Sequence, residues 1–322
     1  MSEYDMSEPK NTRFFTVVGT VFAIALVVSV LASLVVGVQD FVLEPGNVAL
    51  IEITGVLTTQ GVEPSIFTTG QLSSADYAGL IRRAAESDAI DAIVLRVNSP
   101  GGSPVGSHEV MSAVKDAAEK KPVVAYIRET GASGAYWVVS AADFVVAHEL
   151  SITGSVGVMA SYLEFSDLFE EYGIEYVRLA GGEYKDTGSP FRELTDEERV
   201  LIQGKIDIIH GIFFDDVVAS RNLTQLDDEQ LSMVHSGIFF TAPEAYEHLL
   251  IDEIGTFDRV EEILEERYGI DTVQYAPYRR LQPIFSPFGL AYRESLEFLG
   301  SAIGRSLGEV FSRDGTFAPE LK

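Results

Sequence analysis

The sequence contains no cysteine, so disulfide bonds and cysteine-ligated metal sites are excluded. Basic residues are also few. The 322 residues include 23 Lys and Arg against 49 Asp and Glu, for a net charge of -26. A surface of this sign repels nucleic acid and anionic lipid, so no nucleic-acid partner is expected. Because salt screens the repulsion among carboxylates, the composition favours a halophilic protein.

Charge is absent altogether from residues 14–38, which read FFTVVGTVFAIALVVSVLASLVVGV. At about 1.5 Å per residue, a helix of this length can cross a bilayer core of roughly 30 Å. The run exceeds the typical apolar core of a cleaved signal peptide, and protein cores rarely contain such an uninterrupted segment. We therefore predict a transmembrane anchor here.

The flanking charges predict the orientation of this anchor. Lys10 and Arg13 precede it, whereas Asp40 and Glu44 follow it. The positive-inside rule then places residues 1–13 in the cytoplasm and the rest of the chain on the extracytoplasmic side of the cell membrane. The chain is expected to continue through a linker over residues 39–47.

Apolar strand patterns alternate with helical patterns after the linker. This alternation implies an α/β fold with a mainly parallel sheet and right-handed crossovers. Catalytic residues of such sheets gather in loops at the carboxyl ends of the strands, and NSPGG (98–102) and TGASGA (130–135) are loops of that kind. The predicted strands cover residues 48–57, 92–97, 122–127 and 143–148, and the predicted helices cover residues 73–87, 105–120 and 132–142.

Three more helices are predicted in the second half, and the C-terminal tail differs from them. Residues 195–222 begin with a capping threonine and acidic residues, and residues 242–250 and 257–269 are also helical in pattern. Residues 283–322 contain an amphipathic helix whose apolar face needs the domain, another subunit or the membrane surface as a partner. Its apolar positions are Leu296, Leu299, Ile303, Leu307 and Val310.

Ser133 lies in GASGA (131–135), where a strand turns into a helix. Small neighbours allow a substrate carbonyl to approach, and a helix N-terminus directs N–H groups at a developing oxyanion. The Gly134 N–H is the natural first donor, and Gly101 or Gly102 in the neighbouring loop could supply a second. The pattern alone is also typical of a plain turn or helix cap, so both interpretations stay open.

A serine nucleophile needs a base, and the histidines offer no recognisable triad. The segment GASGA departs from the G-x-S-x-G elbow of α/β-hydrolases. His148 follows a strand and is the histidine to weigh, although a polar residue at a strand end is the simpler interpretation. The chain contains His108, His148, His210, His235 and His248.

Lysine is the alternative base, and Lys185 is the only lysine between Lys121 and Lys205. A lysine acts as a base when neutral, so burial must lower its pKa from about 10.4. The neighbouring Asp186 opposes this unless it points to the other side of an extended chain. A solvated loop lysine is the competing interpretation.

Several motifs together resemble the signal peptide peptidase A family. They are NSPGG, TGASGAYW, SITGSVGVMASY, GGEYKDTGSPFRELTDEER and GIFFTAPEAYEHLLIDEIGTFDRV, in that order. Members of the family are membrane-anchored serine proteases with a Ser/Lys dyad and a ClpP/crotonase-like fold. The resemblance covers about residues 48–267 and implies a protease domain over residues 48–282.

Position by position, the resemblance implies a role for each motif residue. Ser133 matches the nucleophile, Lys185 the general base and Ser155 the serine that orients the lysine. The oxyanion loops are matched by Gly101 or Gly102, with Gly134.

Two departures from the family pattern leave the dyad untouched. AYWVVSAAD lacks a second glycine and paired tyrosines, and SGIFFTAPEA lacks an arginine before its Phe-Thr step.

The resemblance implies a membrane-anchored serine endopeptidase that degrades remnant signal peptides and other hydrophobic membrane-derived peptides through an acyl-enzyme. It implies a homo-oligomer, with no metal and no cofactor. One alternative is a protease specific for a membrane protein such as a stomatin-like scaffold. Others are an inactive oligomeric scaffold and a crotonase-like acyl-CoA enzyme, the last disfavoured because the sequence has a membrane anchor and no basic patch for the CoA phosphates.

Overall fold

The computed structural model describes residues 20, 41–42, 46–62 and 70–280. It divides into two units. One comprises Leu43–Val62 and Gln71–Arg279, and the few described residues of the other include strand β1 (Phe41–Val42). Among the described residues, no helix combines the length and apolar character needed to cross a membrane. The predicted anchor over residues 14–38, except Thr20, and the predicted C-terminal helix over residues 283–322 lie outside the described residues.

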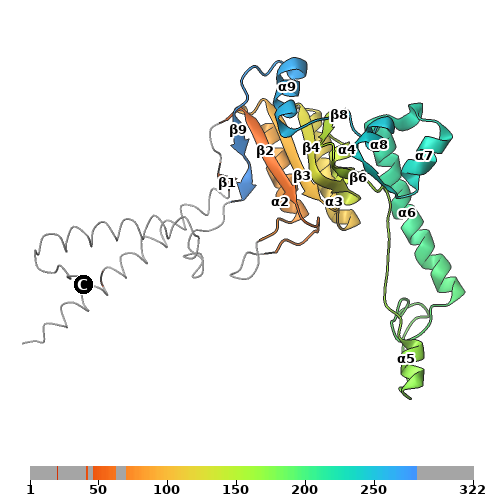
Figure 1. Cartoon of the computed structure of the whole chain (residues 1–322). Coiled ribbons are helices and arrows are strands. Elements are labelled where there is room, and N and C mark those ends of the chain that lie inside the picture. Colours follow the sequence, from red (N-terminus) through yellow and green to blue (C-terminus); the bar gives the residue numbers. More distant parts are fainter. Residues whose placement is uncertain (1–19, 21–40, 43–45, 63–69, 281–322) are drawn as a thin grey trace, which may run out of the picture. The chain divides into compact units, whose positions relative to one another are not determined.

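An eight-stranded sheet forms the centre of the larger unit. Its strands follow the order β7-β6-β4-β3-β2-β9, with β5 beside β4 and β8 beside β5 (Figure 1). Every pair is parallel except β6 with β7. The predicted α/β fold with a mainly parallel sheet is therefore confirmed. The strands are β2 (Val48–Thr54), β3 (Ala92–Ser99), β4 (Val123–Ala132), β5 (Phe144–Ala147), β6 (Ile152–Gly154), β7 (Phe239–Thr241), β8 (Glu253–Ile254) and β9 (Tyr275–Pro277), and β10 (Arg279–Arg280) ends the described chain.

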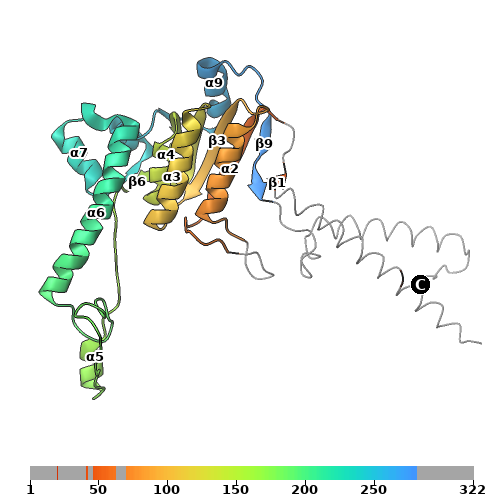
Figure 2. The ribbon, with the colours of Figure 1, turned by 180° about the vertical axis from the view of Figure 1, so that it is seen from behind.

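Helices cover both faces of the sheet, as the nearly continuous apolar strands require. Helix α9 (Phe257–Tyr268) packs Val260 and Leu264 against Val94 of β3 and its neighbours on one face. The alternate side chains of the same strands, such as Leu95, point to the other face and are fully buried. That face is covered by α2 (Ser74–Glu86), α3 (Pro104–Ala118) and α4 (Gly134–Ser140), as Figure 2 shows.

Capping side chains determine where several of the helices begin, α2 and α6 among them. Ser73 accepts a hydrogen bond from the Asp76 N–H at 3.1 Å, and the Asp76 carboxylate accepts from the Ser73 N–H at 3.0 Å. Thr195 and Glu198 form the same reciprocal capping box at the start of α6 (Asp196–Arg221). Each box satisfies orphan N–H groups of the first helical turn, and the predicted helix over residues 195–222 is confirmed.

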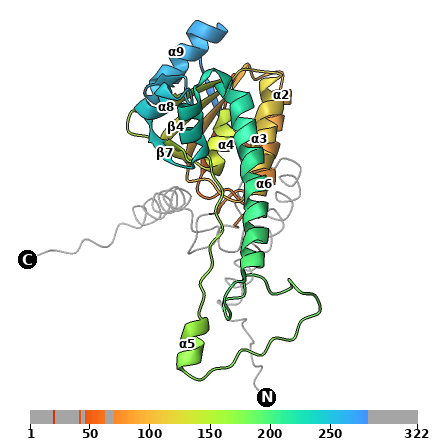
Figure 3. The same ribbon diagram turned by 90° about the vertical axis from the view of Figure 1, so that its right-hand side faces the viewer.

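Residues 157–195, here called the arm, connect β6 to α6 and contain the short helix α5 (Ser166–Glu171). Figure 3 shows the arm and the first turns of α6 extending away from the sheet and its covering helices. None of residues 157–197 is buried, so the arm has no apolar core of its own. The remaining elements after α6 are η1 (Leu223–Gln225), α7 (Asp228–His235) and α8 (Ala242–Glu247).

Strand β4 is longer than the sequence predicts. The pattern ends the strand at residue 127, but β4 continues to Ala132. On one edge Gly131 is in register with Ser99 of β3, and on the other Thr130 is in register with Ile152 of β6. Ladder hydrogen bonds from two neighbours therefore hold this polar, glycine-containing segment extended, and Ser133 follows the strand directly.

Candidate active site

Ser133 joins the end of β4 to the start of α4 in an unusual backbone conformation. Its φ is 53° and its ψ is -128°, a region that residues with a side chain rarely adopt and that costs on the order of 1–3 kcal/mol. The Ser133 N–H donates to the Gly154 carbonyl at 2.8 Å, and its carbonyl accepts from the Trp137 N–H at 3.0 Å. The side chain makes no capping hydrogen bond. Ser133 is therefore not an ordinary helix cap, and its hydroxyl has no hydrogen-bond partner among the residues that the structure describes.

Two predicted glycine loops meet at this serine. A Cβ atom on Gly101 would lie 2.6 Å from the Gly134 nitrogen and 3.0 Å from the Ser133 Cβ. A Cβ atom on Gly134 would lie 3.1 Å from the Gly102 nitrogen. Only glycine allows the backbones of the two loops to approach this closely.

The hydrogen bonds distinguish among the glycine N–H groups. The Gly101 N–H donates to the Ser99 hydroxyl at 3.1 Å and is therefore engaged. Within the described part of the chain, the N–H groups of Gly102 and Gly134 donate to no acceptor. Two adjacent unengaged N–H groups beside a serine hydroxyl have the chemistry of an oxyanion hole. The geometry thus favours Gly102 and Gly134 over Gly101 as donors.

Ser155 lies next to the same site through its neighbour Gly154, which binds the Ser133 backbone. It also has a positive φ of 53°. Its hydroxyl donates to the Gly237 carbonyl at 3.1 Å, and its N–H donates to the Ile238 carbonyl at 3.0 Å. These two bonds hold the Ser155 loop in place.

Lys185 is the one predicted site residue that the described contacts do not join to Ser133. It lies in the arm with an exposed side chain, and its N–H donates to the Gly182 carbonyl at 3.4 Å. Among the described residues, no hydrogen bond or ion pair links its amine to Ser133 or Ser155. The role of Lys185 therefore stays a prediction.

His148 has the features of a structural strand-end residue. Its N–H donates to the Ile127 carbonyl at 3.0 Å, and its Nδ1 accepts from the Leu150 N–H at 3.2 Å. No contact in the described chain joins it to Ser133.

One residue beside the site was missed by the sequence analysis. Ser107 on α3 is fully buried, and its hydroxyl has no hydrogen-bond partner among the described residues. A Cβ atom on Gly134 would meet the Ser107 Oγ at 2.0 Å. Ser107 thus lies directly against one predicted oxyanion glycine, and a lone serine on a helix gives no sequence signal of this.

Buried contacts fix α4, and with it the glycine that follows Ser133. The Tyr136 hydroxyl donates to the Leu250 carbonyl at 2.8 Å, and burial raises the pKa of this tyrosine well above its ordinary value. The Trp137 indole stacks on Phe213 of α6, with ring centroids 4.5 Å apart, and its N–H donates to Asp216 at 3.1 Å. Helix α4 is thereby held on both sides.

Comparisons with known proteins find one matching peptidase family and several relatives that are named as proteases. The sequence model of peptidase family S49 matches residues 115–271. A Methanocaldococcus jannaschii protein that is named as a protease is 33% identical to this chain over 245 residues, which are 76% of each chain. The chloroplastic serine protease SPPA of Arabidopsis thaliana is 30% identical over 191 residues, 59% of this chain and 28% of that protein. A solved 1510-N membrane-bound stomatin-specific protease in complex with a substrate peptide has a TM-score of 0.41 at 14% identity, over 73% of this chain and 87% of that one.

Proposed function

Because the chain belongs to peptidase family S49, we propose that it is a serine endopeptidase with Ser133 as nucleophile and Lys185 as general base. One observation carries the proposal. Ser133 has a strained backbone, its side chain makes no capping hydrogen bond, and it lies beside the unengaged N–H groups of Gly102 and Gly134. The ClpP/crotonase-like form of the fold, which the motifs imply, is part of the same proposal.

The reaction follows from this arrangement. Neutral Lys185 accepts the Ser133 proton through Nζ while the serine Oγ attacks a peptide carbonyl. The N–H groups of Gly102 and Gly134 donate to the oxyanion, and each such donor typically contributes about 10²–10³-fold to kcat. Lys185 then protonates the leaving amine, and water hydrolyses the acyl-enzyme.

We propose that Lys185 reaches Ser133 across two copies of the chain. The arm that carries Lys185 exposes large apolar side chains, including Met159 at 82% and Leu179 at 94%. Such surface is normally covered by a partner. In the proposed homo-oligomer, the arm of one copy packs on a neighbour and brings its lysine to the neighbour's Ser133 and Ser155.

The proposed substrates are hydrophobic peptides, including remnant signal peptides and other membrane-derived segments. A relative in Enterococcus faecium that is named as a signal peptide peptidase, SppA, supports this substrate class. The predicted anchor over residues 14–38 would tether the enzyme at the membrane and raise its effective concentration near such peptides. A protease specific for one membrane protein has the same site chemistry and is distinguished by its substrates.

The test is peptidase activity of the full chain in detergent and molar salt, on an apolar fluorogenic peptide. Ser133→Ala and Lys185→Ala are each expected to lower kcat/KM by about a thousandfold or more, because each removes a reacting group. Circular dichroism checks that both variants stay folded.

Two results would contradict parts of the proposal. Full activity of Lys185→Ala would reject the assigned base and return attention to His148. Inactivity of the unmodified chain across its oligomeric states would favour the inactive scaffold.

A further inference from the structure

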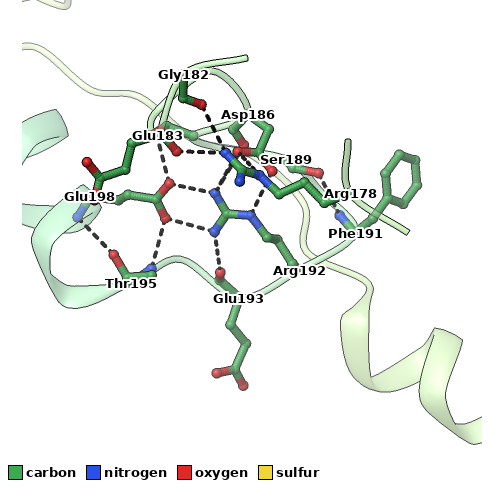
Figure 4. Close-up of polar contacts among 11 residues, drawn as sticks. Arg178, Gly182, Glu183, Asp186, Ser189, Phe191, Arg192, Glu193, Thr195 and Glu198 are labelled. Atoms are coloured by element: carbon green, nitrogen blue, oxygen red, sulfur yellow. Dashed lines mark hydrogen bonds and ion pairs between the residues drawn. The ribbon is translucent and has the colours of Figure 1, made fainter. Parts of the chain in front are cut away.

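Four charged residues of the arm and α6, here called the clamp, surround the turn that carries Lys185. They are Arg178, Asp186, Arg192 and Glu198 (Figure 4). Arg192 is central. Its Nε and Nη2 donate to the two Asp186 oxygens at 3.0 and 3.2 Å, and its Nη1 and Nη2 donate to the two Glu198 oxygens at 2.8 and 2.5 Å. One guanidinium therefore bridges two carboxylates with bidentate geometry, the strongest form of this contact.

Arg178 completes the clamp through contacts with residues on both sides of Lys185 in the sequence. Its Nε lies 2.8 Å from Asp186 Oδ1, and its Nη2 donates to the Gly182 and Glu183 carbonyls at 3.2 and 2.7 Å. The arginine thus holds the backbone before Lys185 and the side chain after it.

Glu198 attaches this turn to a regular element. It is the N3 residue of the α6 capping box, and its side chain is 4% exposed. It also accepts from the Thr187 hydroxyl at 2.9 Å. The residues that follow Lys185 are therefore tied to the start of α6 through both Asp186 and Thr187.

The clamp also determines the charge beside the lysine. An uncompensated Asp186 carboxylate would stabilise the ammonium form of Lys185 and oppose its use as a base. In the structure two guanidinium groups engage that carboxylate, and hydrogen bonds, first from Arg192, lower the pKa of Asp186 to about 2. Nearby Glu183 and Glu193 accept hydrogen bonds from the arginines through their backbone carbonyls. Two cations and two anions leave the clamp neutral.

We propose that Arg192 is a positioning residue of the peptidase reaction, which holds the Lys185 turn on α6 and offsets the charge of Asp186. The inference rests on the proposed role of Lys185 as general base. Arg192 touches neither substrate nor the reacting atoms, and acts through the lysine.

The experiment measures the pH dependence of kcat/KM for the full chain in detergent at constant ionic strength, with the apolar fluorogenic peptide. In Arg192→Gln only Arg178 remains against the Asp186 and Glu198 carboxylates. The net negative charge favours the ammonium form of Lys185, so the acidic limb of the kcat/KM profile is expected to move to higher pH by about half a unit or more. The plateau value of kcat/KM at higher pH is expected to fall about tenfold, because loosening the turn that carries Lys185 misplaces this base.

Further variants separate position from charge. Arg192→Gln with Asp186→Asn is expected to return the limb toward its original pH without restoring the plateau. Asp186→Asn alone leaves two arginines against the single Glu198 carboxylate, so the net positive charge of the clamp is expected to move the limb to lower pH. The matched control is Arg199→Gln, which removes an exposed arginine of α6 and is expected to change neither quantity.

These experiments distinguish the positioning role of Arg192 from the role of Lys185 as general base. An unchanged limb and plateau in folded Arg192→Gln would overturn the positioning role while leaving the dyad intact. If Arg192→Gln does not fold, the opposite shift expected for Asp186→Asn decides, and an unshifted limb there overturns the role. Activity that survives Lys185→Ala would instead reject the proposed function itself.

Discussion

At Gly134, the space for a side chain is already occupied. A Cβ atom there would meet the Ser107 Oγ at 2.0 Å and the Ser107 Cβ at 2.8 Å. Gly134→Ala must therefore displace α3 or α4, and it moves a predicted oxyanion donor. We expect a loss of kcat of about 10²-fold or more, with destabilisation of roughly 1–3 kcal/mol. Peptidase assays and urea unfolding measure the two effects.

Gly204 of α6 provides the matched control for this substitution. A Cβ atom there would have no neighbour within 4 Å. Gly204→Ala is expected to leave kcat unchanged and to stabilise the helix by about 0.4–1 kcal/mol, because alanine loses less backbone entropy on folding. Equal effects of the two substitutions would show that Gly134 is not sterically special.

Some features of the Ser133 site could be predicted from the sequence, and others could not. The motif around Ser133 predicted a serine at a strand-to-helix junction, and the structure places it there. Its φ of 53° and the unengaged N–H groups were not predictable, because they depend on contacts between β4 and the distant Gly101 loop. Ser107 was missed for the same reason.

At the scale of elements, the clamp makes the start of α6 sensitive to acid. Hydrogen bonds, first from Arg192, lower the pKa of both Asp186 and Glu198 to about 2, from ordinary values of 3.8 and 4.5. A carboxylate whose pKa is depressed in the folded state stabilises that state above its unfolded pKa and loses the contribution as pH falls through the folded value. The stabilisation is therefore complete above about pH 4.5 and is lost toward pH 2.

Hydrogen exchange measured from pH 5 to pH 2.5, corrected for intrinsic rates, tests this directly. Amides of residues 182–198 are expected to lose protection in that interval, while those of β3 keep it. The clamp is not the acid-sensitive feature if both segments lose protection together, or if Arg192→Gln shows the same step as the unmodified chain.

Elements with strong local signals were predicted well, and short strands were not. The capping threonine and acidic residues at 195–198 marked the start of α6 in the sequence, and α2 lies within one residue of the predicted helix over residues 73–87. Strands β6, β7 and β8 span only two or three residues each, and the sequence pattern did not predict them. They exist because a neighbouring strand completes their ladder, which is a tertiary effect that local propensity does not encode.

For the whole molecule, the proposed assembly across copies predicts complementation between two inactive variants. Ser133→Ala supplies an intact Lys185, and Lys185→Ala supplies an intact Ser133. Mixed oligomers of the two are therefore expected to recover a substantial fraction of activity, whereas each variant alone has almost none. Co-expression or subunit exchange followed by the peptide assay provides the measurement.

A double variant carrying both substitutions, mixed with either single variant, is informative as the control. With Lys185→Ala it cannot supply a lysine, and with Ser133→Ala it cannot supply a serine, so neither mixture should recover activity. Inactive mixtures of the two single variants, in oligomers shown to contain both chains, would mean that each copy completes its own dyad.

The lack of any buried residue in the arm has a consequence for the timing of proteolysis. If the arm becomes ordered for catalysis only against a neighbour, a newly synthesised copy is harmless until it meets others. The predicted membrane segment at its own N-terminus is a hydrophobic peptide of the kind it is proposed to cut, and a solitary chain could not attack it. The density of copies in the membrane would then decide when the protease begins to act.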